Sequence, residues 1–125
     1  MIRKGDAKMS EYFVEGGKRI AGELHIHGAK NAVLPILAAT LLTKESTLHN
    51  CPNLSDVNAA CDILSYLGCD VMRENNSITV LPQNFGHCDI PDSLMREMRS
   101  SVVFLGAIIA RCGKARVSLP GGCDN

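Results

Sequence analysis

Apolar stretches of helical length alternate with short strand-like segments along most of the sequence. The first stretch runs over residues 32–43. Pro35 is tolerated only in the first turn of a helix, so we expect this helix to begin near Ala32. Asn31 then becomes its expected N-cap, because a short polar side chain can accept a hydrogen bond from the first free N–H groups.

A second helix is expected to open at Ser55 and Asp56 and to stop at Gly68, a residue suited to a helix C-terminus. A third begins near Asp92 or Arg99 and ends before Gly113. Apolar residues of the second helix fall on one stripe, which predicts a face packed against a core. The stripe consists of Val57, Ala60, Cys61, Leu64 and Leu67.

Strand-like segments flank these helices. Residues 23–27 alternate, with Leu24 and Ile26 on one face, and Gly28 ends the segment. The alternation of strands and helices predicts an α/β fold. The remaining expected strands cover residues 12–14, 46–49, a hairpin of 69–73 with 77–81, and 116–119.

A faint internal repeat accompanies this alternation. A shift of 69 residues places Lys30 on Arg99, Val33 on Val102, Ala38 on Ala107 and Leu48 on Val117. Sequence identity between the two copies is poor. The two copies agree better in pattern, because each has a basic residue, an apolar helix, a short link and a strand in that order.

The balance of charged residues bears on the class of function. The 13 basic and 13 acidic side chains cancel, which argues against a nucleic-acid-binding protein. Around the third helix, however, basic residues outnumber the single acid, Glu97. This excess suits a small anionic ligand, although a solvated face is the commoner explanation of a charge run. The basic residues are Arg96, Arg99, Arg111, Lys114 and Arg116.

Nothing in the sequence predicts export or membrane insertion. No segment reaches the ~18 apolar residues of a membrane span, and residues 1–11 lack the apolar part of a signal peptide. We therefore expect a cytoplasmic protein, in which the six cysteines are reduced. The cysteines have no C-x-x-C or zinc-like spacing, and His25 with His27 is weak evidence for a metal, so we expect none.

Two cations and one cysteine are candidates for chemistry. Lys30 and Arg99 each stand at or just before an expected helix start, where backbone N–H groups and a cation together bind phosphate or carboxylate. Solvent-facing side chains are an equal alternative. Cys123 follows Gly121 and Gly122, and a thiol on a mobile loop with basic neighbours can be reactive. An inert loop thiol is the other interpretation.

Four segments resemble the UDP-N-acetylglucosamine enolpyruvyl transferase family. Residues 28–35 (GAKNAVLP) resemble its G-A-K-N-A-x-L-P segment, and 53–57 (NLSDV) the start of its next helix. Residues 98–101 (MRSS) resemble its M-R-A/S-S segment, and 117–123 (VSLPGGC) its catalytic loop. The matches fall in family order and together reach from about residue 12 to residue 123.

The resemblance implies transfer of the enolpyruvyl group of phosphoenolpyruvate to UDP-N-acetylglucosamine with release of phosphate, the first committed step of peptidoglycan synthesis. It implies that Lys30 and Asn31 hold phosphoenolpyruvate, that Arg99 lies at the UDP-N-acetylglucosamine site, and that Cys123 is the general acid. Family members need no metal or organic cofactor, and cysteine-bearing members are targets of fosfomycin. The sister transferase of the shikimate pathway lacks the G-A-K-N segment and the P-G-G-C loop.

The resemblance also implies a domain organisation. The family's fold is an inside-out α/β barrel of repeated α/β units. The strand within residues 1–27 would belong to a second domain, and residues 28–125 would form an incomplete first domain that ends in the catalytic loop. We therefore expect an inactive fragment with exposed apolar helix faces, at Leu34, Leu37, Leu41 and Val102. Asp124 and Asn125 depart from the family pattern. A non-catalytic remnant, or an α/β binding module of the same repeat fold, stays open as the alternative.

Overall fold

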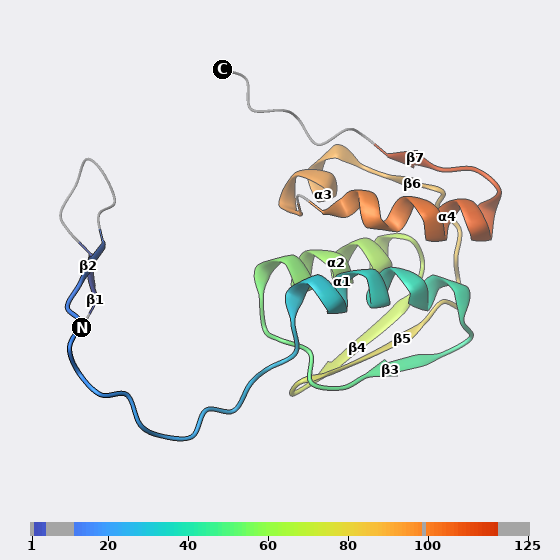
Figure 1. Ribbon diagram of the computed structural model, residues 1–125. Helices are drawn as coiled ribbons and strands as arrows, with labels where there is room; N and C mark the ends of the chain where they lie inside the picture. The colour runs from blue at the N-terminus through green and yellow to red at the C-terminus, as the bar shows by residue number, and fades with distance from the viewer. Residues whose placement is uncertain (1, 5–11, 99, 118–125) are drawn as a thin grey trace, which may run out of the picture.

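The computed structural model describes residues 2–4, 12–98 and 100–117. Figure 1 shows helices stacked between two groups of strands, a three-stranded sheet on one side and a strand pair on the other. Helices and strands alternate along the chain, as the α/β prediction requires. None of the helices in these ranges is long and apolar enough to cross a membrane.

The three-stranded sheet has the order β3–β5–β4 and is antiparallel throughout. β4 (Asp70–Glu74) and β5 (Ser77–Leu81) form the predicted hairpin, and Asn75 turns the chain with a positive φ of 51°. Asparagine tolerates this left-handed conformation better than most residues. β3 (Ser46–Leu48) pairs with the other edge of β5, which points Ile78 and Val80 toward the helices.

The first helix differs from its prediction at its start. α1 (Lys30–Ala39) begins two residues earlier than expected, and a 3-10 turn, η1 (Thr40–Leu42), extends it. The N-cap is therefore Ala29, which offers no side-chain bond, and the expectation for Asn31 is wrong. Pro35 lies past the first turn. The expectation that places Pro35 in the first turn is therefore wrong, and at this point the proline removes the bond to the carbonyl of Asn31 and crowds that carbonyl.

The second helix follows its prediction. α2 (Ser55–Tyr66) opens at Ser55 and buries the predicted stripe, in which only Cys61 is partly exposed. Gly68, at φ 99°, ends the helix, and the N–H of Cys69 returns to the carbonyl of Leu64 at 3.0 Å. This bond from beyond the helix end to its last turn is the usual glycine-terminated arrangement.

The third predicted helix is two helices. α3 (Asp92–Glu97) ends at Met98, whose extended backbone (φ −133°, ψ 111°) turns its side chain fully into the core. A 3-10 turn, η2 (Ser101–Val103), then leads into α4 (Phe104–Cys112), and Gly113 ends that helix as predicted. The sequence pattern does not show the break because the apolar spacing continues through it.

A short parallel strand pair follows these helices. β6 (Asp89–Ile90), which the sequence did not predict, pairs with β7 (Arg116–Val117). β7 begins where the strand over 116–119 was expected, and residues 118–119 lie outside the described ranges. The order of helix then strand recurs, from α1 to β3 and from α4 to β7, as the 69-residue repeat predicts. The copies differ in burial, since Val33 is buried and Val102 is 54% exposed.

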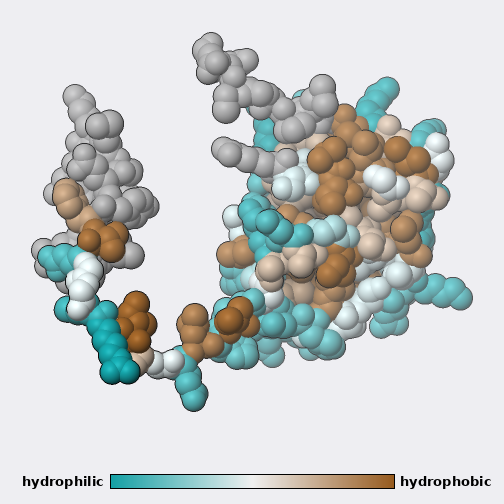
Figure 2. Space-filling view, in the orientation of Figure 1, coloured by the Kyte–Doolittle hydropathy of each residue, from teal (hydrophilic) through white to brown (hydrophobic). Residues whose placement is uncertain are grey.

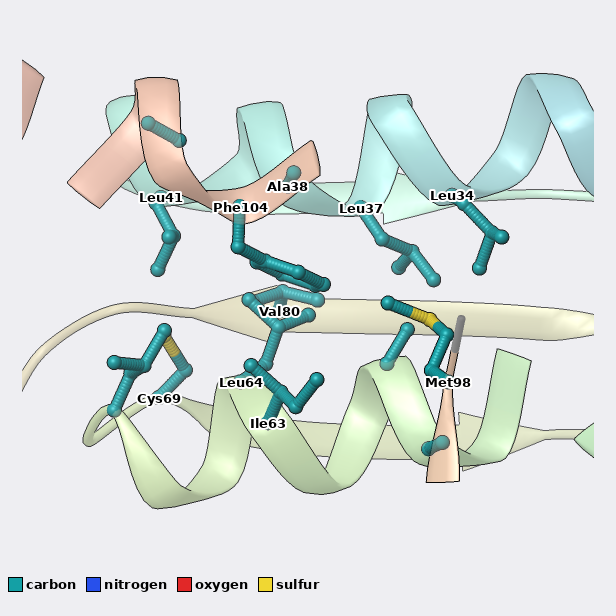
Figure 3. Packing of buried hydrophobic residues seen from close by; sticks show 14 of the residues in the cluster. Leu34, Leu37, Ala38, Leu41, Ile63, Leu64, Cys69, Val80, Met98 and Phe104 are labelled. Atoms are coloured by element: carbon teal, nitrogen blue, oxygen red, sulfur yellow. The ribbon is translucent and has the colours of Figure 1, made fainter. Parts of the chain in front are cut away.

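One hydrophobic core joins the helices to the sheet. Figure 3 shows Phe104 of α4 beside Leu37 of α1 and above Val80 of β5, and all three side chains are fully buried. Leu34, Leu37 and Leu41 are buried, so the expectation that they would be exposed is wrong. They pack against neighbours within this chain, among them α2 and α4. Val102 is exposed, as expected.

Among its described residues, the N-terminal part contains one strand pair, which Figure 1 shows apart from the helices. β2 (Tyr12–Val14) occurs where it was predicted and pairs with β1 (Ile2–Lys4). Residues 23–27 form no strand, which corrects the prediction. Alternation alone does not make a strand without a hydrogen-bonded neighbour, and every residue from 13 to 27 is exposed. Figure 2 shows apolar side chains along this extended segment.

Candidate functional site

Two helix starts lie together at the candidate site. Lys30 is the first residue of α1, and its ammonium lies 2.7 Å from the Asp56 carboxylate in the first turn of α2. Asp56 gains from the positive end of the α2 dipole, whereas Lys30 stands at the positive end of α1. Within the described chain, α1 has neither an acidic residue in its first turn nor a side-chain cap. Its start therefore favours a further anion.

Gly28 sets the entry of the chain into α1. Its N–H donates a 3.2 Å bond to the carbonyl of Asn50, just beyond β3. A Cβ at residue 28 would collide with that same carbonyl oxygen. The close approach explains why the segment before Lys30 contains glycine, since any side chain would push α1 away from β3.

Hydrogen bonds from the β4–β5 hairpin also hold the start of α2. The Arg73 guanidinium donates to the Asn58 side chain and, at 3.1 Å, to the carbonyl of Pro52. The N–H of Cys51 donates to the carbonyl of Asn76 at 2.7 Å. These bonds connect the loop before α2 to the β4–β5 hairpin, so the sheet fixes the position from which Asp56 reaches Lys30.

A hollow of about 290 Å³ adjoins the first turn of α1. Apolar side chains of α1, among them Val33 and Ile36, form one wall, and Leu48 and His49 form another. His49 is hydrogen-bonded through Nδ1 to Ser77 Oγ at 2.9 Å. The hollow is mostly apolar, and it shares Gly28 and Ala29 with the start of the helix.

The predicted basic surface is partly structural. The Arg111 guanidinium donates to the carbonyls of Leu41 at 2.6 Å and Pro82 at 3.1 Å, and it lies 5.1 Å from the Phe85 ring centre. Arg111 therefore ties α4 to the end of η1 and to the segment after β5. Arg111 is exposed, as are Arg96, Lys114 and Arg116, but its guanidinium donors serve the fold.

The described cysteines are free thiols, and burial makes most of them poor nucleophiles. Burial raises the pKa of Cys69 and of Cys112 to about 11, and it also raises the pKa of Cys51 and Cys61. A thiol reacts as the thiolate, so these groups are largely inactive near neutral pH. His25 and His27 face each other edge to face, with ring centres 5.6 Å apart.

The structure brings together only part of the predicted site. Lys30 and Asn31 both lie in the exposed first turn of α1. Arg99 and Cys123 lie outside the described residues. Just after residue 99, η2 packs against α1.

Sequence reasoning missed the role of Asp56 as the partner of Lys30. The sequence showed Asp56 only as a helix opener. A spacing of 26 residues carries no local signal for contact. The one available signal was that Asp56 and Lys30 both lie at expected helix starts. Two helices that pack together can bring such residues into contact.

This arrangement defines an α/β protein with the enolpyruvyl transferase fold. The crystal structure of the enolpyruvyl transferase NikO from Streptomyces tendae matches it with a TM-score of 0.70 at 22% sequence identity. The match covers 80% of this chain and 24% of that chain.

Sequence comparison gives the family. The family model of EPSP synthase (3-phosphoshikimate 1-carboxyvinyltransferase) matches residues 14–124, and the chain belongs to this family. It is 50% identical to UDP-N-acetylglucosamine 1-carboxyvinyltransferase 2 of Caldanaerobacter subterraneus over 93% of the chain, and 47% identical to UDP-N-acetylglucosamine 1-carboxyvinyltransferase of Methylacidiphilum infernorum over 92%. The chain spans 28% and 27% of the length of these two relatives.

Proposed function

We propose that this chain carries part of the active site of an enzyme that transfers the enolpyruvyl group of phosphoenolpyruvate to UDP-N-acetylglucosamine and releases phosphate. The reaction is the first committed step of peptidoglycan synthesis. The observation that carries the proposal is the 50% identity, over 93% of the chain, to a relative named for this chemistry. On this proposal the protein works in the cytoplasm.

The start of α1 supports a role in binding phosphoenolpyruvate. Lys30 and Asn31 place an ammonium and an amide beside backbone N–H groups at a helix start, which is a good setting for phosphate or carboxylate. Asp56 holds the ammonium 2.7 Å away until an anion arrives. Arg99, on the proposal, serves the UDP-N-acetylglucosamine side.

Cys123 is the proposed general acid. Addition across the enol double bond requires a proton at the methylene carbon and cations that balance the phosphate and carboxylate charge. In this proposal the Cys123 thiol donates that proton and can also carry a covalent phosphoenolpyruvate adduct. The raised pKa of Cys51, Cys61, Cys69 and Cys112 makes those four thiols poorer candidates for a reactive role.

Two other functions compete with the proposal. The family model is named for the shikimate-pathway enzyme, but the relatives at 47–50% identity are named for UDP-N-acetylglucosamine. A non-catalytic α/β binding module would keep the fold without needing Cys123. The acceptor substrate distinguishes the proposed reaction from that of the shikimate-pathway enzyme. The effect of Cys123→Ser distinguishes it from a non-catalytic binding module.

A hybrid enzyme tests the proposal, because the relatives are much longer than this chain. Residues 14–124 would replace the matching segment of the Caldanaerobacter relative, and phosphate release from phosphoenolpyruvate would be measured with and without UDP-N-acetylglucosamine. Lys30→Ala should weaken phosphoenolpyruvate binding by roughly 1.5–3 kcal/mol, the value of a charge-assisted hydrogen bond. Arg99→Ala should mainly impair use of UDP-N-acetylglucosamine.

Further variants and a second acceptor substrate distinguish the proposed function from its two rivals. Lys44→Ala, at an exposed lysine away from the helix start, should leave both substrates unaffected. Cys123→Ser should lose most activity, whereas Cys123→Asp should keep some and resist alkylation by fosfomycin. Turnover with shikimate 3-phosphate in place of the UDP-sugar, or full activity of Cys123→Ser, would overturn the proposal. The unmodified relative, assayed in parallel, shows that the assay works.

A further inference from the structure

The half-buried side chain of Arg73, on β4, joins two segments at the start of α2. Its guanidinium donates to the Asn58 side chain and, at 3.1 Å, to the carbonyl of Pro52. Pro52 is buried ahead of the helix and Asn58 lies within it, so the two acceptors lie on either side of Asp56 in the sequence. The hairpin therefore holds both flanks of the residue that contacts Lys30.

The loop before α2 also lies against the start of α1. The N–H of Gly28 donates to the carbonyl of Asn50 at 3.2 Å, two residues before the carbonyl that Arg73 holds. The two helices therefore begin against one short segment of chain. A shift of that segment would move Lys30 and Asp56 relative to each other.

The Lys30 ammonium needs a fixed partner if it is to meet a ligand in one place. The side chain is long, flexible and 44% exposed, so without a partner it would sample many positions in solvent. Asp56 accepts a bond from the ammonium at 2.7 Å, which leaves the other ammonium donors free for an anion. Asp56 can therefore orient the ammonium while a ligand shares it.

We propose that Arg73 is a positioning residue for phosphoenolpyruvate, although its hydrogen bonds go to the loop and first turns of α2. It fixes the start of α2 through Pro52 and Asn58. The start of α2 carries Asp56, which in turn orients the Lys30 ammonium. The inference rests on the proposed function, because that function names the ligand of Lys30.

Arg111 provides a control, because it also donates to backbone carbonyls but at the other end of α1. Its guanidinium donates to the carbonyls of Leu41 at 2.6 Å and Pro82 at 3.1 Å. These bonds hold the end of η1, whereas the candidate site lies at the start of α1. A loss of stability alone would act through Arg73→Met and Arg111→Met alike, so a difference between the two variants reports positioning.

The first measurement requires no enzymatic activity. A water-soluble carbodiimide joins a carboxylate to an amine in direct contact, with loss of water, so it reports the Lys30–Asp56 pair in the 125-residue chain. Peptide mapping should find this linkage in the parent and not in Asp56→Asn. We expect Arg73→Met to lower its yield several-fold and Arg111→Met to keep the parent yield. Asn58→Ala, at an exposed side chain, should also lower the yield, and it replaces Arg73→Met if that variant lacks a cooperative melt.

The second measurement uses the hybrid enzyme that carries residues 14–124 of this chain. Arg73→Met should raise the KM for phosphoenolpyruvate by about 3–10-fold, which corresponds to the loss of one ordinary hydrogen bond. The KM for UDP-N-acetylglucosamine should not change, and Arg111→Met should change neither constant. In the Asp56→Asn background, where the orienting carboxylate is already lost, Arg73→Met should add no further effect.

The two measurements separate this inference from the proposed function. A hybrid without transfer activity, beside a cross-link that depends on Arg73, would overturn the proposed function and with it the ligand assigned to Lys30. An active hybrid in which Arg73→Met leaves the KM for phosphoenolpyruvate unchanged would overturn the inference alone. A lower KM would do the same, because Asp56 would then compete with the ligand. Equal cross-link yields in the parent and Arg73→Met, or an equal rise in KM for Arg111→Met, would also contradict it.

Discussion

The Lys30 ammonium lies 2.7 Å from the Asp56 carboxylate, so one ion pair joins the first turns of α1 and α2. The side chains are 44% and 24% exposed, respectively, which leaves the pair within reach of solvent. Asp56 offsets the unfavourable position of a cation at a helix start. An anionic ligand at α1 would therefore have to share or replace Asp56 as the partner of Lys30.

Because the Lys30–Asp56 ion pair is partly exposed, we expect it to contribute little to the free energy of unfolding. In a double-mutant cycle of Lys30→Met and Asp56→Asn, we expect a coupling of about 0.2–1 kcal/mol from urea unfolding, typical of solvent-exposed pairs. The coupling should shrink in about 1 M salt, because ions screen exposed charges. Lys44→Met provides the uncoupled control. A coupling well above this range, or one insensitive to salt, would mean that the pair is more deeply buried than the structure shows.

Gly28 and Gly106 predict opposite responses to alanine. Gly28→Ala should destabilise the fold, because the new Cβ collides with the Asn50 carbonyl and the bond from residue 28 to that oxygen is lost. Gly106 lies within α4, and a Cβ there meets nothing within 4 Å. Gly106→Ala should therefore stabilise the helix by about 0.5–1 kcal/mol. Thermal melts of both variants would check the contrast, and equal effects of the same sign would contradict it.

Arg111 should behave as a structural residue despite its place among exposed basic residues. Arg111→Ala removes two donors to backbone carbonyls and the contact with Phe85. We expect a loss of about 1–3 kcal/mol in the free energy of unfolding, the usual cost when charged hydrogen bonds are removed. Arg96→Ala, at the exposed end of α3, should change it by less than about 0.5 kcal/mol. Chemical denaturation of the two variants compares them directly.

Local patterns predicted the elements whose signals lie within a few residues. The apolar stripe from Val57 to Leu67, the stop at Gly68 and the turn at Asn75 all follow from short-range periodicity or from backbone preference. These features are decided by the chain near them. For the same reason the sequence predicted Gly113 as the end of α4.

The errors arose where distant contacts decide the structure. The alternation of Leu24 and Ile26 predicts a strand, yet no described strand pairs with this segment, and the two side chains are 87% and 78% exposed. Met98 interrupts a periodic apolar stretch, since its backbone is extended while its side chain is fully buried. The contact of Lys30 with Asp56 likewise depends on how α1 and α2 pack. Sequence spacing does not encode these outcomes.

Because Cys69 is buried, we expect the protein to lose stability at alkaline pH. Its pKa is raised from 9.0 to about 11 because burial disfavours the thiolate. The folded protein therefore keeps the proton that the unfolded chain loses first, so the stabilisation is complete below pH 9 and disappears as pH rises to about 11. Over that interval the parent should lose about 1–3 kcal/mol more than Cys69→Ala. Urea unfolding at several pH values would measure the difference, and parallel curves for the two proteins would show that Cys69 does not contribute.

The 125-residue chain alone should fold around its core yet fail to catalyse the proposed transfer. Leu34, Leu37 and Leu41 are buried by neighbours in this chain, which supports a folded core rather than the exposed helix faces expected from the sequence. The relatives named for the reaction are more than three times as long, since this chain spans 28% of the first of them. An active site that transfers a reactive group needs walls on several sides to exclude water.

The measurement is phosphate release from phosphoenolpyruvate that depends on UDP-N-acetylglucosamine, made beside circular dichroism of the same sample. We expect a cooperative melt and no turnover above background. Turnover that Cys123→Ser abolishes would show that residues 1–125 already contain all the groups the chemistry requires. A chain without a cooperative melt would instead show that the core around Phe104 is insufficient by itself, because the exposed apolar side chains of Ile36, Val102 and Ile109 then need a covering surface.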